Sequence, residues 1–499
     1  MVMKWLGGGK VDHPLAEEKG AKEVLASLAQ GEAGHAIEEI RHWVESVTTT
    51  EGFKTERRGE LLLQLDEAAQ PHQQKLSREY FAGPALSKFQ EARLWGALAG
   101  LATDLGTGYA AVIGQVAADS GSAGRLKPQL PLLAVRAVKA LAAQLKWHYL
   151  HYEAGSGPAW ASLGKAYSFA EAKKIQRESV ALYPRAPLAS SAEREFTKAL
   201  MLAASSPDCL MPLEIDLAER IVAHLSAGFV IANAHQPQST HNWIDLASGA
   251  PPKRLTQTPP ASAGLRFFSA GPADAKLDAM IKVAESGALP SDLSLGTGCE
   301  PARLLAVLRH LKTYWSAQPP VRKHDRYEVK HRLNVVNGFA GVLARLNAGS
   351  ANGSADTWVT ENISAGGIGA IAGKMQGDWL GIGRLVGLSV EGGSSACSVG
   401  MVRRCSRLPD KQSSVGVRTF AKESFPIAFE GGTENDALLL NDGRALKDEV
   451  FICLREGAFD KRASPTIAFD GRNYLLMPLA VSETGVDFEV VRYRVMQQG

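Results

Sequence analysis

Cysteine is scarce in this sequence, and long uninterrupted apolar runs are absent. The five cysteines among 499 residues form no C-x-x-C pair, and their number is odd. This excludes the disulfide framework of a small secreted domain, and we expect incidental buried thiols in a reducing compartment. The most apolar stretch, residues 94–117, contains Asp104 and several glycines, so it falls short of the roughly 18 consecutive apolar residues of a membrane-spanning helix. We expect a pair of buried core helices there, and no membrane insertion.

An excess of charge of one sign is also absent. The chain carries 55 Lys and Arg against 52 Asp and Glu, a net charge of +3. This balance argues against a nucleic-acid coat protein or a polybasic membrane binder, so we do not expect nucleic acid as a partner. Residues 1–10 lack the apolar core of a secretion signal, and acidic residues follow them. We therefore expect a cytoplasmic protein.

The pattern of the sequence changes near residue 320. Before it, apolar residues recur at helical spacing, and the clearest stripe is Leu304, Val307, Leu308, Leu311 and Trp315. Such stripes must be buried against other helices, so we predict an all-α bundle or solenoid over residues 1–315. Stretches rich in Pro, Ser and Gly, at 248–264 and 286–298, mark long loops or subdomain boundaries within it.

Residues 320–499 consist of short β-like runs separated by glycine-containing turns. Strands of this kind at regular spacing indicate antiparallel barrels or sandwiches, and about ten of them exceed one small barrel. We predict one barrel over residues 316–425, and a second, degenerate barrel or β extension over 426–499. The predicted fold class is therefore multidomain α + β, with the helical domain first.

Two short motifs stand at the start of the β region. Arg322 and Arg326 form an R-x-x-x-R where the helical region ends, and Asn362, Ser364 and Gly367 form an N-x-S-x-x-G between two predicted strands. Guanidinium groups bind phosphate bidentately and stack on flat rings, and Asn and Ser offer donors and acceptors to a base edge or phosphate. Glycine permits positive φ and a close approach to a ligand. Together these residues suit a ligand with planar bases and phosphates.

Residues 320–425 resemble a PilZ domain, the bacterial receptor domain for cyclic di-GMP. That family carries R-x-x-x-R just before the first barrel strand and [D/N]-x-S-x-x-G on a later turn of a six-stranded barrel, in the order found here. The resemblance implies that Arg322 and Arg326 clamp phosphates and stack on guanine, and that Asn362 and Ser364 contact guanine and phosphate. It also implies that Gly367 allows a close turn.

This sequence departs from the family pattern in two places. A segment rich in Ala, Gly, Asn and Ser, residues 341–355, lengthens the separation between the motifs, and we expect an expanded hairpin loop there. The β region after residue 425 carries neither motif, so we expect a degenerate second barrel or a dimerisation surface.

The resemblance implies a non-enzymatic cyclic di-GMP receptor. Ligand binding at the junction of the helical domain and the barrel would reorient the two and signal to a protein partner through the helical domain. A homodimer is compatible with this scheme. The alternative is a PilZ-like scaffold that binds protein partners and no nucleotide. A third reading, in which residues 1–315 are an enzyme regulated by the barrel, ranks last because no catalytic set is recognisable there.

Histidines are the remaining candidates for chemistry. His148 and His151 are three residues apart, but no acidic or cysteine partner stands at a fitting spacing, which favours a packed or exposed helix face. His235 and His241 lie in a polar loop, where we expect them to be solvated. No nucleophile turn or paired-carboxylate motif is present. We therefore predict no metal site, no catalytic residues and no cofactor other than the cyclic di-GMP ligand.

Overall fold

The computed structural model of the protein describes residues 11–82, 86–155, 157–184, 189–291, 293, 295, 299–318, 324–348, 356–373, 379–392, 397–430 and 435–497. They form two compact units. The helical unit comprises the described parts of 1–207 and 212–320, and the barrel unit comprises 208–211 and the described parts of 321–499. A helical region followed by antiparallel barrels confirms the predicted fold class.

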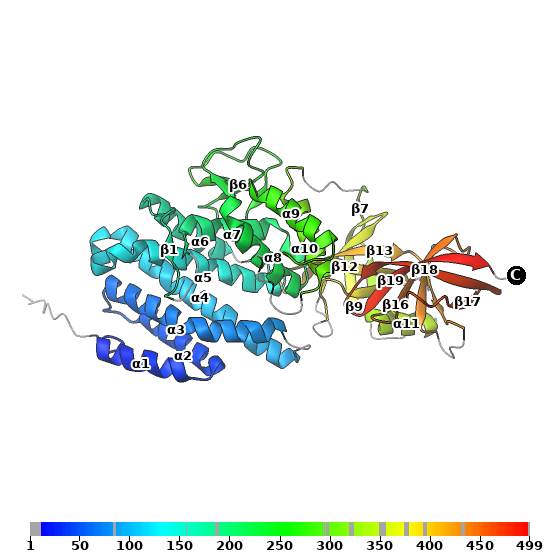
Figure 1. Ribbon diagram of the computed structural model, residues 1–499, viewed down its shortest axis with the longest axis horizontal. Helices are drawn as coiled ribbons and strands as arrows, with labels where there is room; N and C mark the ends of the chain where they lie inside the picture. Colours follow the sequence, from blue (N-terminus) through cyan, green and yellow to red (C-terminus); the bar gives the residue numbers. More distant parts are fainter. Residues whose placement is uncertain are drawn as a thin grey trace, which may run out of the picture. The chain divides into compact units, whose positions relative to one another are not determined.

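The helical unit is built mainly from long α-helices that pack side by side (Figure 1). Helix α2 packs on α3 and α4, α4 packs on α5, and α5 packs on α6 and α7. The helices are α1 (Glu18–Gln30), α2 (Ala33–Thr49), α3 (Thr55–Ala82), α4 (Lys88–Ala118), α5 (Leu130–Leu150), α6 (Gly157–Ala172), α7 (Ala192–Ala204), α8 (Pro212–Leu225), α9 (Ala273–Glu285) and α10 (Pro301–Trp315), with 3₁₀ segments η1 (Ser120–Gln129), η2 (Pro207–Cys209) and η3 (Ser226–Gly228).

Helix α2 illustrates how the sequence specifies these elements. Its start is capped by Glu32, whose carboxylate accepts the backbone N–H groups of Gly34 and His35 at 2.9 and 3.2 Å. These bonds hold the pKa of Glu32 below its usual range. The apolar residues at helical spacing all face the core and are buried: Ile37, Ile40, Val44 and Val47. The stripe predicted on α10 is buried in the same way.

The expectation of two helices over residues 94–117 is wrong, because α4 runs through the whole stretch. Its glycines do not break the helix but let neighbouring helices approach. A Cβ at Gly106 would lie 2.9 Å from Cδ2 of Leu141, and one at Gly108 would lie 2.9 Å from the hydroxyl of Thr48. None of the helices in the described part of the chain combines the length and apolar character needed to cross a bilayer.

The helical unit also contains a small antiparallel sheet that the sequence did not predict. Its order is β3 (Val230–Ala232), β6 (Leu265–Ser269), β4 (Asn242–Asp245), β5 (Lys253–Arg254), and a separate pair joins β1 (Val180–Ala181) to β2 (Ala189–Ser190). The all-α expectation for 1–315 is corrected accordingly. Strands this short leave little periodicity in the sequence. The predicted loop 248–264 contains β5, and 286–298 lies partly outside the described residues.

The barrel unit follows, with every strand pairing antiparallel. Its strands are β7 (Tyr327–Glu328), β8 (Arg332–Asn337), β9 (Asp356–Ser364), β10 (Gly367–Ala372), β11 (Leu385–Val390), β12 (Ser398–Arg407), β13 (Ser413–Ala421), β14 (Ser424–Ile427), β15 (Ala437–Leu440), β16 (Glu449–Arg455), β17 (Thr466–Phe469), β18 (Arg472–Thr484) and β19 (Phe488–Gln497).

Strands β8 to β13 close into a barrel, which we call the first barrel. The order is β10-β13-β12-β11-β8-β9, and β9 pairs back onto β10. Closure pairs each of these six strands on both sides, and side chains such as Trp358 and Leu385 fill the interior. The short strand β7 pairs with β9 beyond the end of β8.

Strands β14 to β19 form a second barrel that is nearly closed. Their order is β14-β15-β16-β19-β18-β17, and an isolated bridge between Phe429 and Ile467 brings the two outer strands together. The interior is an apolar cluster that includes Ile452, Leu476 and Tyr493. The pairing changes from the first barrel to the second between Ala421 and Ser424.

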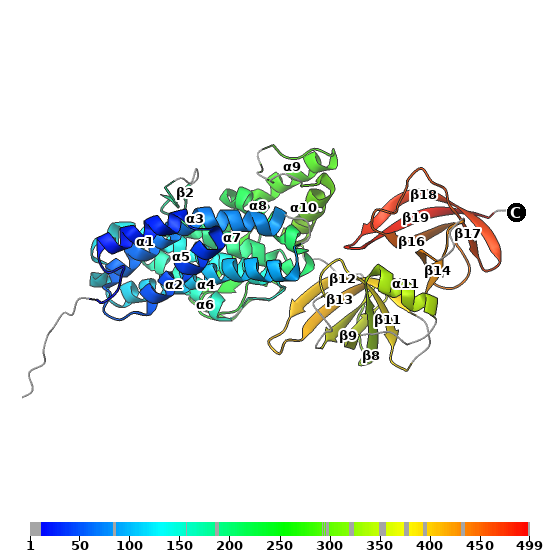
Figure 2. The ribbon, with the colours of Figure 1, turned by 90° about the horizontal axis from the view of Figure 1, so that it is seen from below.

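The predicted expanded hairpin loop over residues 341–355 is wrong in its first part. Helix α11 (Gly338–Ala348) lies between β8 and β9, and residues 349–355 lie outside the described residues. The N–H of Phe339 donates to Oδ2 of Asp487 at 2.7 Å, so a residue of the second barrel caps this helix. Helix α11 contacts β8 and β11 of the first barrel and β14 of the second (Figure 2). Its residues Phe339 and Val342 share one core with residues of both barrels.

Candidate functional site

The segment that carries the second arginine of the R-x-x-x-R motif leads directly into β7. Arg326 is exposed and immediately precedes Tyr327, which pairs with Ile363, while Glu328 pairs with Asn362. Ile363 lies between Asn362 and Ser364 in the sequence. The pairing of β7 with the end of β9 therefore brings Arg326 beside the N-x-S-x-x-G motif. Arg322 lies outside the described residues.

The N-x-S-x-x-G motif spans a tight hairpin. Asn362 and Ser364 belong to the last residues of β9, a two-residue turn follows, and Gly367 begins β10 opposite Ser364. The hydroxyl of Ser364 donates to the backbone carbonyl of Gly367 at 3.2 Å. Register shifts between Gly369 and Ala370, so β9 bulges beside the motif. Bulges of this kind redirect side chains next to functional sites.

The glycines of this hairpin are required because neighbouring atoms leave no room for a Cβ, and not because the backbone has a positive φ. Glycine permits positive φ, but neither Gly366 nor Gly367 adopts it. A Cβ at Gly367 would lie 2.2 Å from the carbonyl oxygen of Val417 on β13. A Cβ at Gly369 would lie 2.9 Å from both the oxygen and the nitrogen of the Asn362 amide. Glycine at 369 therefore lets the Asn362 side chain lie across β10.

Three residues beside the motifs were not singled out from the sequence. Tyr327 and Ile363 are direct cross-strand partners, so their side chains share one face, and they are 66% and 38% exposed. The His324 ring lies 3.1 Å from the position of a Cβ at Gly366. Together they give the edge of the hairpin an exposed aromatic surface. The only sequence signal for them is their position next to a motif residue.

The local charge is mixed. Arg418 on β13 pairs with Gly367, and its Nη1 lies 2.5 Å from Oε2 of Glu483 on the second barrel. The other oxygen of Glu483 lies 3.5 Å from Nη1 of Arg403 on β12. Both arginine side chains are about half exposed, at 54% and 53%. One carboxylate thus pairs with two guanidinium groups. Because its single negative charge does not balance both positive charges, the arginines can bind another anion.

His148 and His151 each lie beside a carboxylate, although the sequence shows none at metal-ligand spacing. His148 Nδ1 lies 2.5 Å from Glu153 Oε2, and His151 Nε2 lies 2.9 Å from Glu91 Oε1. The chain turn after α5 and the packing of α4 supply these carboxylates. Within the residues that the structure describes, no group of three or more His, Cys, Asp or Glu is arranged to hold a metal ion.

Three of the five cysteines, Cys397, Cys405 and Cys453, are buried, while Cys209 and Cys299 are only partly buried. Burial raises the pKa of each of the three buried thiols, in Cys405 to about 12. They are therefore protonated at neutral pH and unreactive as nucleophiles.

Comparison with known proteins finds a family model that is similar to most of the helical unit. Residues 19–236 match the model of a family described as the N-terminal domain of the cyclic-di-GMP receptor FimW. The match covers α1 to α8, less than half of the chain, and ends before the R-x-x-x-R motif. No curated protein matches the sequence.

Proposed function

We propose that this chain is a receptor for cyclic di-GMP, which it binds at the hairpin of the first barrel without catalysing a reaction on it. The observation that carries the proposal is the pairing of β7 with the end of β9, which brings Arg326 beside Asn362 and Ser364. The family match in the helical unit supports the same ligand independently, because it lies outside both motifs.

Each side chain at the hairpin has a chemical role in this proposal. Arg326, with Arg322 four residues earlier, binds the phosphates through charge-assisted hydrogen bonds. The Asn362 amide and the Ser364 hydroxyl meet a guanine edge or a phosphate. The exposed Tyr327 ring offers a flat surface for guanine. Because the attraction is largely between exposed charges, the affinity falls as salt is added.

The proposed signal follows from the place of the arginines in the chain. Residues 321–326 directly follow the helical unit in the sequence and begin the longer part of the barrel unit, and the chain also passes between the units on either side of residues 208–211. A ligand held by both Arg322 and Arg326 restricts this segment, and it favours those arrangements of the two units in which both arginines reach it. Binding then shifts the population of arrangements by the difference in affinity between them. The helical unit would pass this change to a protein partner.

Calorimetric titration of the full chain with cyclic di-GMP tests the proposal. Separate titrations with GTP and cyclic GMP, which are chemically related, are the controls. We expect saturable binding of cyclic di-GMP alone. Arg326→Ala should weaken it by about 10- to 100-fold, since a charge-assisted bond contributes about 1.5–3 kcal/mol. Arg472→Ala, an exposed arginine at the β17–β18 turn, is the matched control and should leave binding unchanged.

Two outcomes would contradict the proposal in different ways. Unchanged binding in Arg326→Ala would show that the ligand binds elsewhere. Absence of binding in folded wild-type protein would leave the alternative function, a PilZ-like scaffold for protein partners. Capture of partners with the full chain, in the presence and absence of ligand, would then be the informative experiment.

A further inference from the structure

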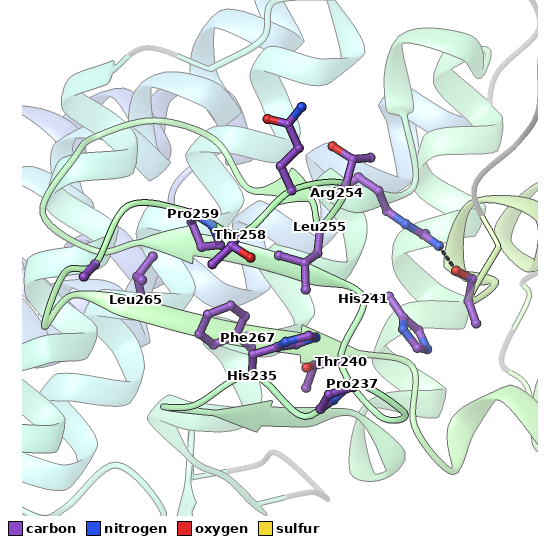
Figure 3. Close-up of a pocket in the computed structure, with 14 residues that line it drawn as sticks. His235, Pro237, Thr240, His241, Arg254, Leu255, Thr258, Pro259, Leu265 and Phe267 are labelled. Carbon is purple, nitrogen blue, oxygen red and sulfur yellow. Dashed lines mark hydrogen bonds between the residues drawn. The ribbon is translucent and has the colours of Figure 1, made fainter.

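A recess opens on the small sheet of the helical unit, away from both motifs in the sequence (Figure 3). Its volume is about 630 Å³. Small-molecule sites in proteins commonly measure about 300–1,000 Å³. The recess is formed by β5 and β6, by the loop that joins them, by the loop before β4, and by Ala317 beyond the end of α10. It therefore has the size of a metabolite site.

One wall of the recess is an aromatic platform. The rings of His235 and Phe267 lie with their centroids 5.6 Å apart and their planes inclined by 39°. Phe267 is buried on β6, whereas His235 is exposed on the loop before β4. Leu255 faces this platform across the recess (Figure 3). A flat ring of a ligand fits between an aromatic surface and an aliphatic one.

The other wall carries positive charge with no acidic counterpart. The Arg254 guanidinium donates to the backbone carbonyls of Tyr314, Ser316 and Ala317. No carboxylate forms an ion pair with it in the described part of the chain, and no described Asp or Glu lines the recess. Carbonyls solvate the guanidinium but do not neutralise it, so the recess attracts anions.

His241 lies beside this guanidinium and is held in place by its own backbone. Its N–H donates to the carbonyl of Phe268 at 3.2 Å, and its carbonyl accepts from the N–H of Leu255 at 2.9 Å. Burial and the charge of Arg254 lower the pKa of His241, although the nearby Asp274 acts in the opposite direction. The ring is therefore neutral at pH 7 and can donate one hydrogen bond to an anionic group.

We propose that this recess binds a small aromatic anion, with its ring on the His235–Phe267 platform and its carboxylate or phosphate toward His241 and Arg254. The sequence predicted that His235 and His241 are solvated. His235 is exposed, whereas His241 is only partly exposed. The proposal does not depend on cyclic di-GMP binding at the hairpin, because none of its residues belongs to the barrel unit.

The test compares 2-naphthoate with its neutral amide, 2-naphthamide, on the full chain by saturation-transfer NMR and titration. We expect naphthoate to bind at least about fivefold more tightly than the amide, because only the carboxylate gains from the positive wall. Phenyl phosphate in a parallel titration distinguishes a preference for phosphate from one for carboxylate. His235→Ala and His241→Gln should each weaken naphthoate binding by about threefold or more, while His35→Ala, an exposed histidine on α2, should not.

Hydrogen exchange locates the bound ligand without any substitution. Naphthoate should protect the backbone of β5 and β6 from exchange, and naphthamide at the same concentration should protect it less. Equal affinities for naphthoate and naphthamide, or unchanged binding in both histidine variants, would overturn the proposal. Arg326→Ala should retain naphthoate binding, so failure at the hairpin and failure at the recess remain distinguishable.

Discussion

At the scale of single residues, the hairpin of the first barrel depends on the absence of side chains as much as on their presence. Gly367→Ala would place a Cβ 2.2 Å from the carbonyl oxygen of Val417, which backbone pairing holds in place. We expect the strands to separate locally at a cost of about 1–3 kcal/mol. The thermal unfolding temperature of the barrel unit should fall, and cyclic di-GMP binding should weaken with it.

Gly373→Ala is the matched control for this substitution. Gly373 follows β10 directly, and a Cβ there would meet no atom within 4 Å. It should unfold at the wild-type temperature and bind the ligand normally. Wild-type behaviour of Gly367→Ala in both measurements would mean that the hairpin relaxes without cost and that its close packing is not needed for binding.

At the scale of elements, the second barrel reaches the edge of the site through Glu483. This carboxylate binds Arg418 and Arg403 of the first barrel, and it competes with any phosphate for the same guanidinium groups. Glu483→Gln removes the competing charge, so we expect cyclic di-GMP to bind about 3- to 10-fold more tightly. Calorimetry measures the change. Glu449→Gln is the control, because Glu449 pairs with Arg492 within the second barrel. Weaker binding in Glu483→Gln would show instead that Glu483 orients these arginines for the ligand.

A buried ion pair joins α5 to α8 in the helical unit. Lys146 Nζ lies 2.7 Å from Oδ1 of Asp216, and Arg220 donates to the other oxygen at 2.8 Å. Burial alone would raise the pKa of Asp216, but these two cations outweigh it and hold the pKa below its usual value of 3.8. The folded state therefore binds the proton more weakly than the unfolded state. The stability from this carboxylate is present above about pH 4 and is lost as the pH falls through the lowered pKa.

Asp216→Asn should accordingly destabilise the helical unit by about 1–3 kcal/mol at pH 7, with Lys146 left partly unpaired. Urea unfolding followed between pH 7 and pH 3 should show the difference from wild type shrinking below about pH 4. Glu285→Gln, in the exposed pair with Arg309, should change stability by less than about 0.5 kcal/mol at any pH. A pH-independent loss in Asp216→Asn would assign the effect to packing rather than to charge.

The elements that sequence reasoning predicted correctly are those specified locally. The predicted apolar stripe of α10 is buried, and the β-like runs after residue 320 form antiparallel strands. Helix α11 was missed because its cap, Asp487, lies in the second barrel, 148 residues from Phe339. Helix α4 was predicted as two helices because its glycines suggested a break. In the structure these glycines give room to the helices that pack against α4, which the sequence around them does not indicate.

The residues of the candidate site also differ in whether a local sequence pattern could predict them. The two motifs predicted four residues of the described part of the site, because the residue types and their spacing indicate the chemistry: Arg326, Asn362, Ser364 and Gly367. Tyr327 and Arg418 contribute through strand register, and Glu483 contributes through contact between two barrels. No local pattern encodes such pairings. The recess of the helical unit was missed for the same reason, since its walls come from two short strands, the loops beside them and Ala317 beyond α10.

At the scale of the whole molecule, the proposed signal is a change in how the two units are arranged. Small-angle X-ray scattering of the full chain should therefore change when cyclic di-GMP saturates the proposed site, because Arg322 and Arg326 lie where the chain enters the longer part of the barrel unit. Arg326→Ala should abolish the change at the same ligand concentration, whereas Arg472→Ala should preserve it. Light scattering on the same samples measures the mass and separates rearrangement within one chain from formation of a homodimer. Saturable binding with an unchanged scattering curve and an unchanged mass would contradict the proposed rearrangement of the two units. The protein would still bind cyclic di-GMP, and the signal would then have to arise at the surface of the barrel itself.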